Sequence, residues 1–406
     1  MKLLRSFRNN CLLAAKGTKG PMKNFWESDS SAIKIINVQA ILKKYQIVIG
    51  SGVLERFHKV ISSDFKEINK IVLVSNDRIY ALYKEKLQKM LKACNVAFEI
   101  IIIKDGEKYK NLESAQLIYG KLLNQNFHRN DLIVAFGGGV IGDLAGFVAS
   151  TFHRGTKLLQ FPTTIIGQVD SSIGGKVVVN FDEIKNVIGC FYQPDMVLID
   201  PDLLKTLDET QIINGLAEIV KYGIIFNRNI LKVLDENISG LADERLFELV
   251  KSRSFTDLIY ECCKIKAKVI EKDEFDTGHR NLLNFGHTIG HAIEKVSKLG
   301  TINHGMAVAL GMIVALDISE NLNILKNGFK DDFLQLYKKL KLPFKIPANL
   351  NVEDIISALK FDKKFTDSKN RFVLLRGMNK PAIVENIDEK LIADCIIKNL
   401  KKGNNK

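Results

Sequence analysis

The stretch that decides the fold is Asp131–Phe136 (DLIVAF) followed by Gly137–Asp143 (GGGVIGD). The first segment is an apolar run of strand length, and the second leads into a helical stretch. Gly137, Gly139 and Gly142 match G-x-G-x-x-G in the strand–turn–helix setting that this motif requires. Glycine lets the backbone approach a pyrophosphate, which binds to the free N–H groups of the helix N-terminus. The motif predicts a dinucleotide site, with a tight structural turn as the alternative.

The acidic ribose acceptor that usually follows this motif is missing from its place about 20 residues further on. That place holds Pro162-Thr163-Thr164. We therefore expect the acceptor to come from elsewhere, and Asp105-Gly106-Glu107, after the preceding predicted strand, is the candidate.

Apolar segments alternate with helical ones on both sides of the glycine stretch, from Gln46 to about residue 200. This alternation predicts a parallel sheet with helices on both faces. The predicted strands are Gln46–Ile49, Ile71–Ser75, Ala97–Ile103, Asp131–Phe136, Lys157–Phe161 and Met196–Asp200, and two of the helices are Asp77–Ala93 and Asn111–Phe127.

After Pro201 the strands nearly stop. The sequence predicts an α/β, Rossmann-like nucleotide-binding domain (residues 44–200), then an α-helical metal- and substrate-binding domain (201–406), with residues 1–43 as a basic extension. The predicted helices are Glu209–Phe226, Phe247–Glu271, Asn281–Leu299, His304–Asn321 and Val352–Lys360, and Arg371–Leu375 with Ala382–Val384 is a predicted hairpin.

The length of the chain indicates the number of domains, and its charge indicates the class of partner. A chain of 406 residues exceeds what one core usually supports, which agrees with two domains. The 59 Lys and Arg against 46 Asp and Glu give a net charge of +13, which suits an anionic partner or a lysine-rich solvated surface. No nucleic-acid-binding signature is present, and the longest apolar stretch, Ala307–Leu316, is about half of the ~20 residues that span a bilayer. We expect neither nucleic acid nor membrane as a partner.

The first residues are basic, and six Lys and Arg precede the first acid, Glu27. We expect a basic tail, and an organelle transit peptide is the alternative. The six cysteines form no CxxC pair, which favours reduced thiols and a cytoplasmic location.

Three of the seven histidines fall close together and predict a metal site. His287 and His291 are four residues apart, on one face of a predicted helix, and His304 follows. Two histidines with one carboxylate, for which Glu218 is the candidate, form a common catalytic zinc set with an open position. The spacing does not decide between His287 and His291. The pattern lacks the glutamate of HExxH, which argues against a peptidase.

Cations and amides accompany these motifs. Lys176 ends the segment Asp170–Lys176 (DSSIGGK), and Lys185 and Asn186 follow it. Lysine and arginine beside glycine turns suit phosphate and carboxylate groups, although each alone is more often a solvated surface residue. The further candidates are Arg154, Lys221, Lys266 and Arg280.

The combination resembles the 3-dehydroquinate synthase family of sugar-phosphate cyclases, from about Gln46 to Leu400. The motifs that carry the resemblance are Gly137–Asp143, Pro162–Thr164, Asp170–Lys176, Lys185–Pro194, Gly215–Gly223, Leu283–His291 and His304-Gly305. The resemblance implies conversion of 3-deoxy-D-arabino-heptulosonate 7-phosphate to 3-dehydroquinate. In that reaction, NAD transiently oxidises C5, phosphate leaves by β-elimination, C5 is reduced again, and an intramolecular aldol step closes the ring. It also implies a homodimer.

The resemblance implies a role for each site residue. Glu218, His287 and His304 become ligands of Zn²⁺ (Co²⁺ is possible), and Asp170 and Lys221 lie beside the reacting hydroxyls. The implied phosphate contacts are Lys176, Asn186, Asn284, His291 and either Lys363 or Lys364. The implied carboxylate contacts are Lys266 and Arg280, and Arg154 is implied to reach the partner subunit's site. The implied NAD contacts are Asp105, Gly106, Glu107, Lys108, Tyr109, Lys110, Gly139, Val140, Ile141, Gly142, Asp143, Thr163, Thr164, Lys176, Lys185, Leu203, Leu204, Lys205 and Thr206.

One position departs from the family pattern. The family usually has His-Gly-Glu at the third ligand, where this chain has His304-Gly305-Met306. If that glutamate supports the site, its loss lowers zinc affinity or rate. The alternatives are another sugar-phosphate cyclase, a metal-dependent dehydrogenase that releases NADH, and a catalytically inactive dimeric binding protein.

Overall fold

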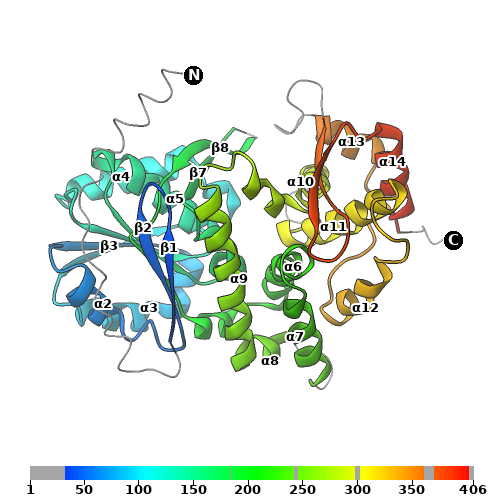
Figure 1. Ribbon diagram of the computed structural model, residues 1–406. Coiled ribbons are helices and arrows are strands. Elements are labelled where there is room, and N and C mark those ends of the chain that lie inside the picture. The colour runs from blue at the N-terminus through cyan, green and yellow to red at the C-terminus, as the bar shows by residue number, and fades with distance from the viewer. Residues whose placement is uncertain (1–32, 183, 242–245, 298–301, 361–369, 402–406) are drawn as a thin grey trace.

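The computed structural model describes residues 33–182, 184–241, 246–297, 302–360 and 370–401, in two domains that lie side by side (Figure 1). The strands are β1 Lys34–Gln39, β2 Lys44–Ile49, β3 Lys70–Asn76, β4 Ala97–Ile103, β5 Leu132–Gly137, β6 Lys157–Pro162, β7 Lys176–Phe181, β8 Ile184–Phe191, β9 Met196–Ile199, β10 Arg371–Leu375 and β11 Pro381–Glu385. The helices are α2 Phe57–Asp64, α3 Asp77–Lys92, α4 Leu112–Asn124, α5 Gly139–Thr151, α6 Glu209–Ile225, α7 Arg228–Ser239, α8 Leu246–Lys251, α9 Arg253–Lys272, α10 His287–Val296, α11 His304–Asn321, α12 Asp331–Lys339, α13 Val352–Lys360 and α14 Glu389–Lys398.

A seven-stranded sheet forms the first domain, in the order β1-β2-β9-β6-β5-β3-β4. Every pair is parallel except β1 with β2. The glycine stretch follows β5, in the interior of the sheet, and α5 begins at Gly139. The predicted α/β class is therefore confirmed, and the predicted dinucleotide turn lies at the carboxyl ends of the parallel strands.

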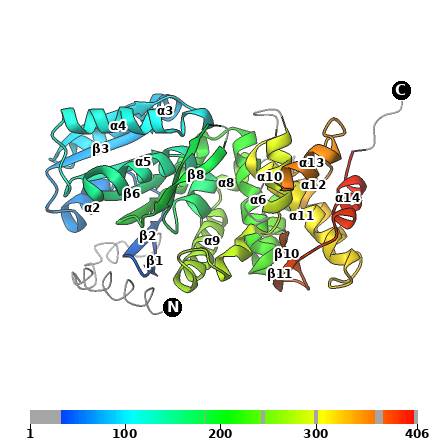
Figure 2. The same cartoon turned by 90° about the horizontal axis from the view of Figure 1, so that it is seen from above.

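Helices cover both faces of this sheet (Figure 2). Successive side chains of β3 point to opposite faces. Ile71 and Leu73 pack in one core with residues of α2 and α3, whereas Val72 and Val74 pack in another with residues of α4 and α5. Because both faces are buried, these strands are continuous apolar runs rather than alternating ones.

The sheet domain differs from the prediction at two places. β1 pairs with β2 over its whole length, so the sheet begins at Lys34 and not at the predicted residue 44. The cation-rich segments after Lys176 form an antiparallel hairpin of β7 and β8, which the sequence analysis did not predict as strands. Most of its residues are exposed or half-buried, although Val177 and Val179 pack in the hydrophobic core.

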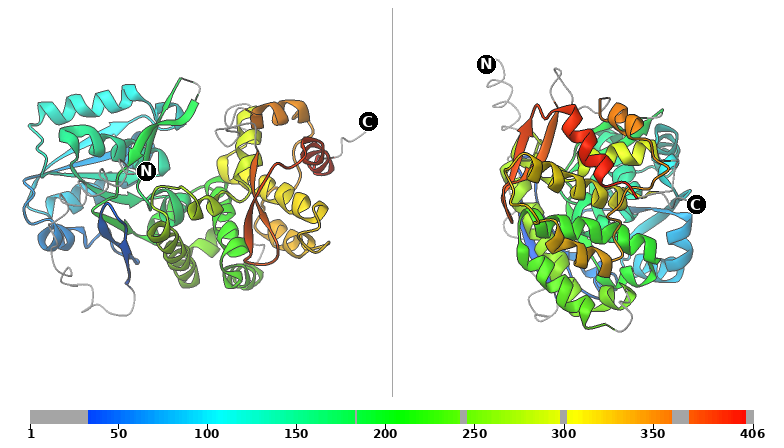
Figure 3. Two further views of the ribbon diagram at one scale, coloured as in Figure 1. Left: turned by 45° about the horizontal axis from the view of Figure 1, so that its top comes forward. Right: turned by 90° about the vertical axis from the view of Figure 1, so that its right-hand side faces the viewer.

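The second domain is helical, as predicted, with the hairpin β10–β11 at its surface (Figure 3). The single helix predicted over Phe247–Glu271 is two helices, because the Ser252 side chain accepts a hydrogen bond from the Phe255 N–H and caps α9. Helices α7, α12 and α14 were not predicted from the sequence. Within the described residues, no helix combines the length and apolar character that a bilayer span requires.

Candidate metal centre and anion cluster

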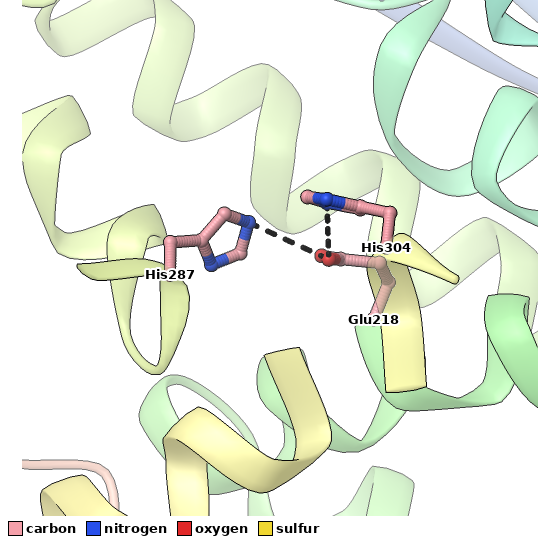
Figure 4. A group of neighbouring side chains, drawn as sticks. All are labelled: Glu218, His287 and His304. Atoms are coloured by element: carbon pink, nitrogen blue, oxygen red, sulfur yellow. Dashed lines mark ion pairs between the residues drawn. The ribbon is translucent and has the colours of Figure 1, made fainter. Parts of the chain in front are cut away.

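Three helices of the second domain bring the predicted metal ligands together (Figure 4). Glu218 lies within α6, while His287 and His304 are the first residues of α10 and α11. The Glu218 Oε1 atom is 3.5 Å from His287 Nε2 and 3.7 Å from His304 Nε2. The candidate ligand atoms of the three residues all lie within 4.8 Å of one another. His287 and His304, which follow Glu218 by 69 and 86 residues in the sequence, thus form one site with it.

Close backbone contacts explain why these helix ends meet. A Cβ on Gly311 of α11 would lie 2.0 Å from the carbonyl oxygen of Gly286, the residue before α10. A Cβ on Gly305 would lie 1.9 Å from the carbonyl oxygen of Asn214 in α6. Any larger residue at either position must push the helices apart, so the two glycines allow the contacts that place the ligands.

The donor set fits a divalent cation. Glu218 is fully buried, and its Oε1 accepts no hydrogen bond from any residue that the structure describes. A buried carboxylate oxygen without a donor is costly, and both histidine nitrogens are too distant to donate to it. The other ring nitrogen of each histidine faces an oxygen: His287 Nδ1 is 3.1 Å from the Phe285 carbonyl, and His304 Nδ1 is 3.2 Å from Glu294 Oε2. Each Nε2 is thereby left to face the centre of the group, as a metal ligand requires.

The charged groups of the site shift one another's pKa values. Burial raises the pKa of Glu218, but the adjacent Lys221 ammonium, together with His287 and His304, outweighs it and holds that pKa well below its usual range. Burial and the same ammonium lower the pKa of His287. Burial lowers the pKa of His304 too, yet the neighbouring carboxylates of Glu218 and Glu294 raise it to about 9. Negative charge therefore dominates around His304, which favours a bound cation.

The structure distinguishes between the two neighbouring histidines, His287 and His291. His287 belongs to the cluster of ligand atoms, and His291 does not. The His291 ring lies beside both others, with centroids 5.5 Å from His287 and 5.7 Å from His304. Met306, the departure from the family pattern, is half-buried and packs against the hydrophobic core.

A second cluster joins the two domains at Asp170, in the turn Gly167–Ser171. The Lys266 ammonium of α9 donates to the Asp170 carboxylate at 2.5 Å, and the Tyr222 hydroxyl donates to the same oxygen at 2.9 Å. Burial raises the pKa of Asp170, but Lys266 and Lys221 outweigh it and hold the pKa well below its usual range. Burial lowers the pKa of Lys266 to about 8, even though Asp170 raises it.

Arg280 is buried at the edge of this cluster. One of its guanidinium nitrogens, Nη1, donates to the carbonyls of Gly174 at 3.0 Å and of Glu274 at 2.7 Å. It therefore connects the loop before β7 to the segment after α9.

Two of the predicted phosphate contacts, Lys176 and Asn186, already have partners. Lys176 contacts the Asp276 carboxylate, and Asn186 accepts a hydrogen bond from Lys110 at 2.6 Å. Asn284 is half-buried just before α10, and Arg154 is exposed in the loop after α5. Asp362, Lys363 and Lys364 lie outside the described residues.

The predicted dinucleotide contacts gather at the carboxyl ends of β4, β5 and β6. Asp105 follows β4 and accepts a hydrogen bond from Asn76 at 2.6 Å. Gly138 caps α5 without a side chain, so the N-cap residue offers no acceptor to the N–H groups of the first turn. The Thr163 hydroxyl is buried, with no hydrogen-bond partner among the described residues. These open donors fit a pyrophosphate.

Some of the predicted dinucleotide contacts face elsewhere. The side chains of Leu203 and Leu204 are in the hydrophobic core, so only their backbone could reach a ligand. Lys205 is exposed and pairs with Asp202. Lys110, in contrast, faces another predicted contact, Asp143, at 2.5 Å.

Comparison with known proteins decides the family. Residues 100–214 match the model of the N-terminal region of 3-dehydroquinate synthase, and residues 215–365 match that of its C-terminal region. The chain belongs to the 3-dehydroquinate synthase family. Curated members from Clostridium tetani and Buchnera aphidicola are each 40% identical to it, over 87% of this chain and 92% and 97% of their own lengths.

Solved structures of related cyclases share the fold of this family member. A 2-deoxy-scyllo-inosose synthase, complexed with carbaglucose-6-phosphate, NAD⁺ and Co²⁺, is 26% identical with a TM-score of 0.78, over 90% of this chain and all of its own. A 2-epi-5-epi-valiolone synthase from Streptomyces hygroscopicus, with NAD⁺ and Zn²⁺, is 24% identical with a TM-score of 0.77, over 87% of this chain and 96% of its own.

Several side chains that contact the predicted site residues were not predicted from the sequence, among them Tyr222, Asp276 and Glu294. Glu294 could have been found, because it lies seven residues after His287, two helical turns along the same face. Tyr222 and Asp276 give no such signal, since their contacts with Asp170 and Lys176 join segments far apart in the sequence.

Proposed function

We propose that this chain converts 3-deoxy-D-arabino-heptulosonate 7-phosphate to 3-dehydroquinate and phosphate. The observation that carries the proposal is the three-residue metal site next to a buried cluster of cations, in a member of this family. A substrate with one carboxylate and one phosphate needs such cations for binding and alignment.

Two bound groups would supply chemistry that side chains lack. Glu218, His287 and His304 would hold a zinc or cobalt ion, which lowers the pKa of a coordinated hydroxyl. The glycine turn at Gly139, with Thr163, would hold NAD, which takes a hydride from the substrate and returns it within one turnover.

The chain's own residues would set the charges around the reacting carbon. Lys221 is fully buried between acids, and although burial lowers its pKa, Glu218 and Asp170 raise it, so the ammonium keeps its charge. It can donate a hydrogen bond to the oxygen at the oxidised carbon. Asp170 has a depressed pKa, which makes it a weak base and suits it to orienting Lys266 and Tyr222.

Phosphate binding would require exchange of partners at two positions. Lys176 would leave Asp276, and Asn186 would leave Lys110, in order to contact the substrate phosphate. Asn284 and His291 would complete this set, while Lys266 and Arg280 would bind the carboxylate. Because β7 and β8 carry Lys176 and Asn186, movement of this hairpin would accompany substrate binding.

The homodimer and the cytoplasmic location are further proposals. Arg154 is exposed in the loop after α5, with a backbone φ of 60°, and would reach the partner's site there. Sedimentation of the purified protein tests the dimer, and mixing Arg154→Ala subunits with a second inactive variant tests whether the site is shared. Import through the basic extension is the alternative to a cytoplasmic location.

The decisive experiment mixes the purified protein with zinc, NAD⁺ and the heptulosonate phosphate. Release of phosphate and 3-dehydroquinate without net NADH supports the proposal. Net NADH would indicate the dehydrogenase instead, and absence of turnover would leave a binding protein. Turnover of a sugar phosphate without the carboxylate, at a higher kcat/KM, would indicate another cyclase.

A further inference from the structure

Glu294 links the metal site to the sheet domain through both oxygens of one carboxylate. On α10, its Oε2 is 3.2 Å from Nδ1 of His304, and its Oε1 accepts a salt bridge from Lys185 Nζ at 2.7 Å. Lys185 belongs to β8, in the hairpin of the sheet domain. The carboxylate is mostly buried, with 19% of the side chain exposed.

We propose that Glu294 is the positioning residue that holds His304 as a metal ligand. This inference rests on the proposed metal site. A histidine that binds a metal through Nε2 carries its proton on Nδ1, and an acceptor for that proton fixes both the tautomer and the ring orientation. Glu294 is that acceptor, while Nε2 of the same ring faces Glu218.

The location of Glu294 suits this task because it shares a rigid element with another ligand. His287 begins α10, and Glu294 lies two turns further on the same face. The backbone of α10 packs closely on α11, since a Cβ on Gly290 would lie 3.0 Å from the carbonyl oxygen of Ala307. One helix thus supplies the first histidine and the acceptor for the second.

The two contacts of Glu294 should contribute unequally to metal affinity. Lys185 is 45% exposed, and ion pairs of exposed lysines contribute little. The partner His304 is a proposed ligand, so the loss of its acceptor acts directly on the metal. We therefore expect the histidine contact to determine metal affinity, and the lysine contact to add little to it.

The test measures zinc affinity by chelator competition, and the absorption spectrum of the cobalt-substituted protein, for wild type and variants. Glu294→Ala is expected to weaken zinc binding about tenfold to a hundredfold and to change the cobalt bands. Glu294→Gln keeps an oxygen that can accept from Nδ1, so its loss of affinity should be smaller. Lys185→Met should change zinc affinity less than about fivefold. Glu389→Gln, an exposed acid that pairs with Lys360, controls for a general charge effect.

The outcomes separate this inference from the proposed function. If Glu218→Gln binds zinc as tightly as wild type, the metal site itself is wrong. If Glu218→Gln loses zinc while Glu294→Ala keeps wild-type affinity and an unchanged cobalt spectrum, only the role of Glu294 is overturned. An equal loss in Glu294→Ala and Lys185→Met would also overturn it, because the hairpin contact would then be the cause. Should Glu294→Ala not fold, Glu294→Leu, which also removes the acceptor but fills more of the space, decides against it if zinc affinity and cobalt bands are unaltered.

Discussion

Replacing Glu218 by glutamine tests the metal centre most directly. The change keeps the size of the side chain and removes its charge and one ligand oxygen. Two effects follow from the structure. The metal loses one of three protein ligands, and the buried Lys221 ammonium loses its closest carboxylate. Breaking a buried ion pair from one side costs about 3–5 kcal/mol, so the metal-free variant should unfold at a lower temperature than wild type.

The response to metal separates these effects. A ligand at 100 times its Kd stabilises the native state by about 2.7 kcal/mol. For a domain of 150–250 residues, this corresponds to a rise in Tm of about 5–11 °C. Wild type should show this rise when zinc is added, and Glu218→Gln should show almost none. The measurement is thermal unfolding with and without zinc at a fixed excess.

Asp317→Asn is the matched control. Asp317 is also a fully buried carboxylate of the second domain, and it contacts Lys330 at 2.8 Å and Lys398 at 2.7 Å. Its loss should lower Tm and leave the zinc-induced rise intact. A full zinc-induced rise in Glu218→Gln would refute the assigned ligand set.

Three further predictions concern the anion cluster and the helix contacts. Arg280→Ala should raise KM for the heptulosonate phosphate more than tenfold, since charge-assisted hydrogen bonds contribute about 1.5–3 kcal/mol each, and should lower kcat less; steady-state kinetics that leave KM unchanged would remove Arg280 from carboxylate binding. Lys266 carries its charge below its pKa of about 8, so KM should rise as the pH increases through 8, and Lys266→Arg should move this rise to higher pH; identical pH profiles would argue against the assignment. Gly305→Ala should destabilise the protein by about 1–3 kcal/mol and weaken zinc binding, because the added Cβ collides with the Asn214 carbonyl and displaces the start of α11; denaturant unfolding together with chelator competition checks both effects, and unchanged zinc affinity would mean that α11 relaxes without moving His304.

The core strands could be predicted because their signal is local. A strand buried on both faces is a short apolar run, and β3, β5 and β6 were each predicted within one residue of their bounds. β1 and the hairpin β7–β8 could not be predicted in the same way. β1 lies at an edge of the main sheet and β7–β8 lies outside it, and both are partly exposed. Their strand pairing joins them to neighbouring segments.

The candidate site likewise has features that the local sequence predicts and features that depend on tertiary contacts. Residue type and spacing alone indicated a dinucleotide turn, a carboxylate–histidine metal set and a surplus of cations, because each motif is a short segment whose chemistry is carried by its own residues. The spacing left the choice between His287 and His291 open; the family resemblance implied His287, and the folded arrangement of the ligand atoms agrees. The placement of Glu294 between His304 and Lys185 and the bond from Tyr222 to Asp170 were decided only when the chain folded. Those contacts join residues from separate helices and from both domains. The distances between these residues depend on how closely the helix backbones pack, as at Gly305 and Gly311. No local sequence pattern encodes that packing.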